Sequence, residues 1–342
     1  MKFQRDISSS QATLPIVCAV ALALWFILPS HTSQDFLAPD YGIWQYMPTL
    51  FHSSQYTLPL GVLCAAIAVY MMVELKNKNL LLRVNSYMIS STLALLLALA
   101  APTHHIQPGC LLMLFTLYAY FPLFASYQLP YPHIAFSIFF PLSLASLFFP
   151  KILLLVPLYW CFQIYLRAFS LRAFLASIIA TLLPYWFYGG IAIITHSLPQ
   201  FLTHLQSVIS IPDLFVTPLF SAECGGFSLP NILSSFLPFF LLAIIMALIG
   251  IIDFQLHKLL DKTRTRSLYN VIQWHSAAIF IFILLYHQHA TTILPLFLID
   301  ASILYGHFFT LTHTRFSHIC NIVVVLLMVA IAILQGLTNY LL

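Results

Sequence analysis

The sequence predicts an all-α polytopic membrane protein, a bundle of about eleven transmembrane helices with a cytoplasmic N-terminus. Composition is the first observation behind this prediction. Of the 342 residues, 61% are hydrophobic and only 6% are charged, and the mean hydropathy is +0.95. Soluble chains carry about 25% charged residues, so this chain lacks the charges for a water-facing surface. We therefore expect one integral membrane domain over residues 1–342.

A series of apolar runs is the second observation. The runs cover residues 14–28, 57–75, 85–101, 110–127, 134–150, 152–169, 173–195, 230–253, 271–287, 292–309 and 319–340. Several are short for a hydrocarbon core about 30 Å thick, so the sequence is compatible with roughly nine to twelve spans. The N-terminal run lacks a signal-peptidase cleavage pattern after it and is expected to remain as the first span.

The distribution of basic residues is the third observation. Residues 254–270 are predicted to be a basic cytoplasmic loop, which also offers contacts to lipid headgroups, because they hold Lys258, Lys262, Arg264 and Arg266. With the N-terminus inside and about eleven crossings, every Lys and Arg except Lys151 falls on the cytoplasmic side. The C-terminus is then expected outside.

Two long segments on the expected external, periplasmic side contain neither Lys nor Arg: residues 31–56 and 196–230. Aromatic residues in the first segment favour an interfacial position. In the first half of the second segment, apolar residues recur at helical spacing, which predicts an amphipathic helix along the membrane surface.

Asp300 is the main candidate for an intramembrane polar site. It lies within an apolar run, where an ionised carboxylate is costly unless it is paired or hydrated. His307 follows seven residues later on the same helical face, and His275 lies near the expected cytoplasmic start of the preceding span. These three residues could form a proton relay or a polar binding point. The alternative is that Asp300 only hydrogen-bonds a neighbouring helix.

Two aspartates in the first external segment, Asp35 and Asp40, are candidate catalytic residues by position alone. Multi-span lipid-linked glycosyltransferases place a catalytic aspartate in that loop, where it deprotonates an acceptor. Such enzymes also need cations to hold a lipid phosphate, and the expected external loops offer only Lys151.

Two histidine pairs on the expected external side are weak metal-ligand candidates. They are His104 with His105, and His287 with His289. Neither has the spacing of a specific metal site, so neither a metal nor a cofactor is predicted. The net charge of +4 is too small to indicate nucleic acid. The expected partners are the lipid bilayer and other membrane proteins.

A set of landmark motifs resembles a family of uncharacterised multi-span inner-membrane proteins of Bacteroidetes, a domain of unknown function. The motifs, in chain order, are ELKNKNLLLRVNSYM, IQPG, SYQLPYP, SLASLFFPKILLLVPLYW, LRAFSLRAFLASIIATLLPYWF, DKTRTRSLYN and LTHTRFSHI. The resemblance covers roughly residues 57–342. It implies a bacterial inner-membrane location and no particular activity.

The leading functional hypothesis is a non-enzymatic component of the cell envelope, either a scaffold or a partner subunit. It follows from a chain that is nearly all membrane and carries few interior charges. The first alternative is a permease for a small or lipidic solute, using Asp300 and His307. The second is a lipid-linked glycosyltransferase-like enzyme, using Asp35 or Asp40. Whether the protein is an enzyme stays open, and the composition favours a non-enzymatic role.

Overall fold

The structure of the protein is a computed structural model. It describes residues 10, 12–28, 44, 57–84, 86–100, 104–209, 236–286, 289–312 and 314–341. Within these residues all regular structure is helical. The elements are α2 (Thr13–Ile27), α4 (Thr57–Asn79), α5 (Met88–Leu99), α6 (Pro108–Ala125), α7 (Pro132–Phe148), η4 (Pro150–Leu155), α8 (Val156–Tyr165), α9 (Leu171–Ile194), α10 (Leu198–Ile209), α12 (Phe236–His257), η5 (Lys258–Leu260), α13 (Thr263–Leu285), α14 (Ala290–Leu311) and α15 (Arg315–Leu341).

The chain is a helical membrane protein. Seven of the described helices are long and apolar enough to cross a membrane: α4, α6, α9, α12, α13, α14 and α15. Shorter apolar helices, α2, α5, α7 and η4 with α8, occupy the other four expected spans. A helix therefore lies at each of the expected segments, whereas the number of crossings and their direction stay predictions.

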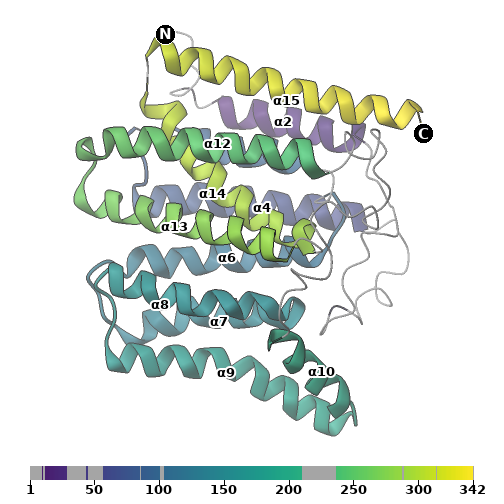
Figure 1. The fold of residues 1–342 in the computed structure, drawn as a ribbon, viewed down its shortest axis with the longest axis vertical. Helices are drawn as coiled ribbons and strands as arrows, with labels where there is room; N and C mark the ends of the chain where they lie inside the picture. The colour runs from purple at the N-terminus through teal and green to yellow at the C-terminus, as the bar shows by residue number, and fades with distance from the viewer. Residues whose placement is uncertain are drawn as a thin grey trace.

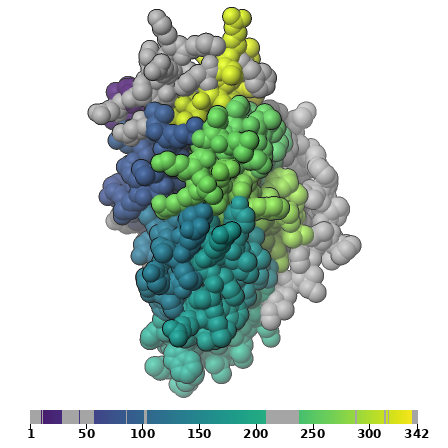
Figure 2. All heavy atoms as spheres, turned by 90° about the vertical axis from the view of Figure 1, so that its left-hand side faces the viewer, coloured from purple at the N-terminus to yellow at the C-terminus, as the bar shows by residue number. Residues whose placement is uncertain are grey.

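Most of the long helices lie side by side with nearly parallel axes, whereas α14 crosses them obliquely, and the connections gather at the two ends of the bundle (Figure 1). Seen from the end where α12 joins α13, the C-terminal helix α15 and the pair α7 and α9 lie at opposite extremes of the longest axis (Figure 2). The central position belongs to α14. Every residue of α14 except Thr291 and Leu311 is buried, so this helix is enclosed by protein.

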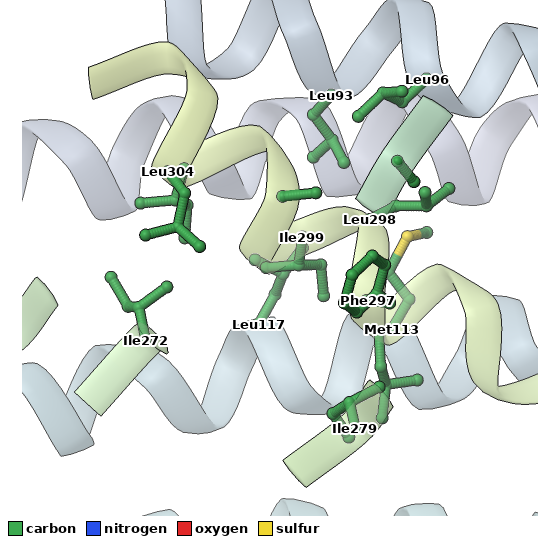
Figure 3. Packing of buried hydrophobic residues seen from close by; sticks show 14 of the residues in the cluster. Leu93, Leu96, Met113, Leu117, Ile272, Ile279, Phe297, Leu298, Ile299 and Leu304 are labelled. Carbon is green, nitrogen blue, oxygen red and sulfur yellow. The ribbon is translucent and has the colours of Figure 1, made fainter. Parts of the chain in front are cut away.

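The core around α14 is aliphatic and aromatic. Side chains of α5, α6 and α13, among them Leu93, Leu117 and Ile272, pack around α14 residues such as Leu304 (Figure 3). α12 also approaches α14 closely, because Gly250 faces the Leu304 backbone without a side chain between them. Small residues at a membrane helix contact let two backbones come together.

Helix boundaries at Pro150 and Ser170 separate the closely spaced apolar runs 134–150, 152–169 and 173–195. Pro150 starts the 3₁₀ segment η4, where its missing N–H leaves no bond unmade. Ser170 caps α9 by accepting a hydrogen bond from Ala173 N on its side-chain oxygen, at 3.2 Å. Pro157, by contrast, begins α8 instead of interrupting a longer helix. The expected 152–169 span is therefore a 3₁₀ segment followed by a short α-helix.

The expected amphipathic helix after residue 196 is confirmed as α10. It packs on the end of α9 through His204, whose ring is buried against Tyr185 and Tyr188. The Nε2 atom of His204 lies 3.4 Å from the Tyr185 hydroxyl, which is itself 2.9 Å from Ser146 Oγ. A polar contact therefore anchors the buried face of this helix.

The predicted basic loop at 254–270 is shorter than expected. α12 continues to His257 and α13 begins at Thr263. Only residues 258–262 connect the two helices, and Arg264 and Arg266 lie in the first turn of α13. Both helices therefore extend further into the polar segment than the hydropathy pattern alone indicated, because helical hydrogen bonding continues past the apolar residues.

Candidate functional site

A cluster of four polar side chains lies inside the bundle. Asp300 comes from the middle of α14, His275 from α13, Tyr120 from α6 and Tyr159 from α8. All four are completely buried. We call these residues the central cluster.

Short contacts join the members of the central cluster. The Tyr120 hydroxyl donates to Asp300 Oδ1 at 2.6 Å and lies 2.7 Å from His275 Nδ1. His275 Nδ1 is 2.7 Å from Asp300 Oδ2, so each carboxyl oxygen has a polar partner. On the other side of the imidazole ring, Nε2 is 3.3 Å from the Tyr159 hydroxyl. The carboxyl group and the imidazole are therefore linked through direct contacts and a shared tyrosine.

His275 lies deeper in the bundle than the sequence suggested. The apolar run that contains it begins at residue 271, which placed His275 near an interface. In the structure α13 begins eight residues earlier, at Thr263. His275 is then about 18 Å along the helix from its start, at about 1.5 Å per residue. The predicted association of His275 with Asp300 holds, but it occurs in the middle of two long helices.

The central cluster can hold a proton. Burying an isolated charge in a membrane interior costs roughly several kcal/mol of free energy, and a partner of opposite charge reduces that cost. The same pair can instead consist of two uncharged groups, with the proton on the carboxyl group and none added to the neutral imidazole. Adding one proton to an aspartate and a neutral histidine gives one of two states. The proton on the imidazole makes an ion pair, and the proton on the carboxyl group makes a pair of uncharged groups. This arrangement suits reversible proton binding.

The structure separates His307 from the central cluster. Its Nε2 atom lies 3.4 Å from Asp261 Oδ2, at the end of the bundle where α12 joins α13. The Tyr269 ring, fully buried in α13, lies 4.4 Å from the His307 ring between centroids. On the other carboxyl oxygen of Asp261, Arg83 Nε lies 2.6 Å from Oδ1. A second carboxyl–imidazole pair thus occupies one end of α14.

Opposing effects act on the pKa of Asp261. Burial raises the pKa of this carboxyl group, but contacts with His307 and Arg83 and their positive charges outweigh burial and lower it below the ordinary value. Asp261 is thus held in its ionised form. The sequence analysis did not single out Asp261, because a carboxylate within a polar, basic segment is not unusual.

Tyr120, Tyr159 and Tyr269 were also missed. The chain contains 17 tyrosines, and no spacing relates these three residues to Asp300 in the sequence. Only the packing of α6, α8 and α13 around α14 brings their rings to the two polar sites.

The basic residues gather at the same end as Asp261. Arg264 Nη2 donates to Asn79 Oδ1 at 3.4 Å and to the Phe124 carbonyl at 3.3 Å, which ties α13 to the ends of α4 and α6. Lys258 donates to Gln255, and Arg266 to Thr263. Lys151, the one basic residue expected outside, lies over the ring of Tyr286 at the opposite end of α13. This grouping agrees with the positive-inside pattern of the sequence.

The histidine candidates for metal binding make other contacts. His104 is buried, stacks on Trp25 at 4.5 Å and lies 2.9 Å from the Ala98 carbonyl. His105 Nδ1 is 2.9 Å from Thr57 Oγ1, and the His289 ring meets Phe149 edge-on. Within the described parts of the chain, His, Cys, Asp and Glu form no group of three that could hold a metal ion. His287 lies outside those parts, as do Asp35 and Asp40.

Comparisons with family models, with curated proteins and with solved structures found no match for this chain. The resemblance to the Bacteroidetes inner-membrane family therefore stays a prediction.

Proposed function

We propose that the protein is a proton-linked permease for a small or lipidic solute, in which Asp300 and His275 bind the coupling proton. The observation that carries this proposal is the position of the pair, fully buried in the middle of α13 and α14. Ionisable side chains inside membrane segments are costly, and they typically mark proton relays and solute pathways.

Prolines beside the central cluster support this proposal. Pro122 lies two residues after Tyr120, Pro157 two before Tyr159 and Pro295 five before Asp300. Pro122 and Pro295 are inside α6 and α14, where each removes a backbone hydrogen bond. In transporters, interrupted helices surround the binding site near the middle of the membrane. Two of the four helices that form the cluster, α6 and α14, therefore carry an internal break close to it.

The test uses purified protein in liposomes that contain a pH-sensitive dye. Amino acids, sugars, nucleosides and organic acids are added singly, and proton movement is recorded. We expect at least one solute to drive proton flux through the wild type, and Asp300→Asn and His275→Gln to abolish that flux. His204→Gln is the matched control, because His204 is a buried histidine in α10 outside the central cluster. Wild-type flux in Asp300→Asn would refute the proposal.

A second candidate is the non-enzymatic envelope component or partner subunit, set in a bacterial inner membrane. It is favoured by the enclosure of α14 and by the contacts of both Asp300 oxygens within the protein. In this role the central cluster serves only to hold four helices in one arrangement. Full complementation of a deletion strain by Asp300→Asn and His275→Gln would support it, and chemical cross-linking in cells would then identify the partners.

The glycosyltransferase alternative depends on Asp35 and Asp40, which lie outside the described residues. It stays a prediction, and a deletion strain complemented with Asp35→Asn and Asp40→Asn together would test it.

A further inference from the structure

The polar contacts between α13 and α14 form a series that runs from the middle of the two helices toward one end of the bundle. The two helices are antiparallel, since His275 meets Asp300 while the earlier Tyr269 meets the later His307. Asp261, just before α13, continues the series to the end of the bundle. We call Asp300, His275, Tyr269, His307 and Asp261 the polar seam. About 10 Å of helix separates its two carboxyl–imidazole pairs, at about 1.5 Å per residue.

The other half of the same helix contact is apolar. Toward the opposite end, α13 contributes Ile279 and Ile283 to the hydrophobic core, and α14 contributes Ile293 and Phe297. The polar seam therefore leads from the central cluster toward one end of the bundle. That end also carries Arg83, Arg264 and the other basic residues of the α12–α13 connection.

Two buried polar atoms in the seam are available for further hydrogen bonds. Tyr269 Oη and His307 Nδ1 make no hydrogen bond to any described residue. Both side chains are almost completely buried. Buried polar atoms in proteins generally bind a partner or water, and both atoms can pass protons along hydrogen bonds.

We propose that the polar seam is the path by which protons reach Asp300 and His275 from the basic end of the bundle. The inference deepens the proposed permease function and rests on it, and it assigns the side from which the coupling proton enters. Asp261 and His307 form the entry site, and Tyr269 lies next to it on the way to the central cluster. Because the positive-inside pattern places the basic end in the cytoplasm, the proton enters from the cytoplasmic side.

Other charged and titratable groups face the seam from every neighbouring element. Arg83, between α4 and α5, contacts Asp261. From α12, Asp253 is paired with His257 at 2.9 Å and adds negative charge near His307. Tyr120 and Tyr159 face the central cluster from α6 and α8. Arg83 keeps Asp261 ionised, and the ionised carboxylate attracts the arriving proton to the His307 imidazole beside it.

The transfer needs no co-reactant. The protonated His307 imidazole gives up its proton by breaking an N–H bond, and this proton forms an O–H bond on Asp300 or an N–H bond on His275. His307 then takes up a new proton from the basic end of the bundle. The entry site returns to its initial state, and one positive charge has moved inward.

The experiment measures how fast Asp300 gains a proton. Protein in proteoliposomes is subjected to a pH jump, and infrared difference spectra follow the carboxylic acid band that is missing in Asp300→Asn. We expect Asp261→Asn and His307→Gln to slow the appearance of this band on the order of a hundredfold, the usual contribution of a positioned proton carrier. The double variant should slow it no further, since both residues belong to one entry site. His204→Gln, which removes a buried histidine outside the seam, should leave the rate unchanged.

The outcomes separate this inference from the proposed function. A band that appears at the wild-type rate in both entry-site variants overturns the entry path but leaves the permease intact. If the wild type shows no Asp300 band at any pH, or if Asp300→Asn transports normally, the permease itself fails. If an entry-site variant does not insert into the membrane, the rate of the Asp300 band in Tyr269→Phe provides the test, because this substitution removes only a hydroxyl group. A rate unchanged in Tyr269→Phe would then count against the path.

Discussion

Arg83 and Asp261 form an ion pair of 2.6 Å between two connections that are far apart in the sequence. One residue lies between α4 and α5 and the other between α12 and α13. The Asp261 side chain is 1% exposed, whereas that of Arg83 is 42% exposed. Arg83 therefore covers a buried carboxylate at the end of the bundle and joins its first half to its second half.

Loss of this ion pair should destabilise the protein. Arg83→Gln leaves the buried carboxylate with the His307 imidazole as its remaining partner, and we expect a cost of about 2 kcal/mol. Lys78→Gln is the matched control, because Lys78 pairs with Glu74 at 3.3 Å on an exposed helix surface. That change should cost only about 0.3 kcal/mol. Thermal unfolding in detergent measures both, and equal shifts in Tm would contradict the prediction.

The contact between α12 and α14 should not tolerate an added methyl group. A Cβ atom on Gly250 would lie 2.5 Å from the Leu304 carbonyl carbon, which is main chain and unable to rotate away. We expect Gly250→Ala to cost about 1–3 kcal/mol through overpacking. Gly190 in α9 has no atom within 4 Å of such a Cβ, so Gly190→Ala should be neutral or slightly stabilising. Equal unfolding temperatures for the two variants would contradict this prediction.

Acidification should weaken the docking of α10 on α9. Burial lowers the pKa of His204 from 6.5 to about 4, so the docked helix disfavours the protonated ring. A histidine with a lowered pKa stabilises the docked state fully above its ordinary pKa, and this contribution is lost as the pH falls from 6.5 toward about 4. Hydrogen exchange of amides 198–209, corrected for intrinsic rates, should therefore speed up at about pH 4.5 relative to about pH 7.

The control for this effect is His204→Phe, which keeps an aromatic ring against Tyr185 and Tyr188 but cannot titrate. Its exchange should show little pH dependence. His133→Gln replaces an exposed histidine on α7 and should behave as the wild type. If His204→Phe retains the full pH effect, another group is responsible.

Membrane orientation can be tested with reporter fusions. We expect a fluorescent protein inserted after Lys262 to fold in the cytoplasm, because this connection belongs to the basic end of the bundle. Alkaline phosphatase joined after Leu342 should be active, which requires an external C-terminus. Replacing Lys258, Lys262 and Arg266 with Gln should increase the fraction of inverted molecules. Inactive phosphatase at the C-terminus would require an even number of crossings.

The positions of most helices could be predicted because each apolar run had to form a helix in lipid, where backbone groups need internal partners. Boundaries were predicted less well. α13 begins within the polar segment that was expected to be a loop, because a helix continues past the edge of the membrane when its residues permit it. Asp300 could be identified as unusual from its surroundings alone, since a carboxylate in an apolar run is rare.

The partners of Asp300 could not be derived in the same way. His307 shares its helical face, as the spacing of seven residues predicted, yet it faces Asp261 instead of the central cluster. Helical periodicity determines which residues of one helix share a side, and composition determines that the chain enters a membrane. Which helices meet, at what depth and in what register depends on side-chain packing between distant segments. That packing brings Tyr120, Tyr159 and His275 around Asp300, and so only the tertiary structure decided what the buried carboxyl group contacts.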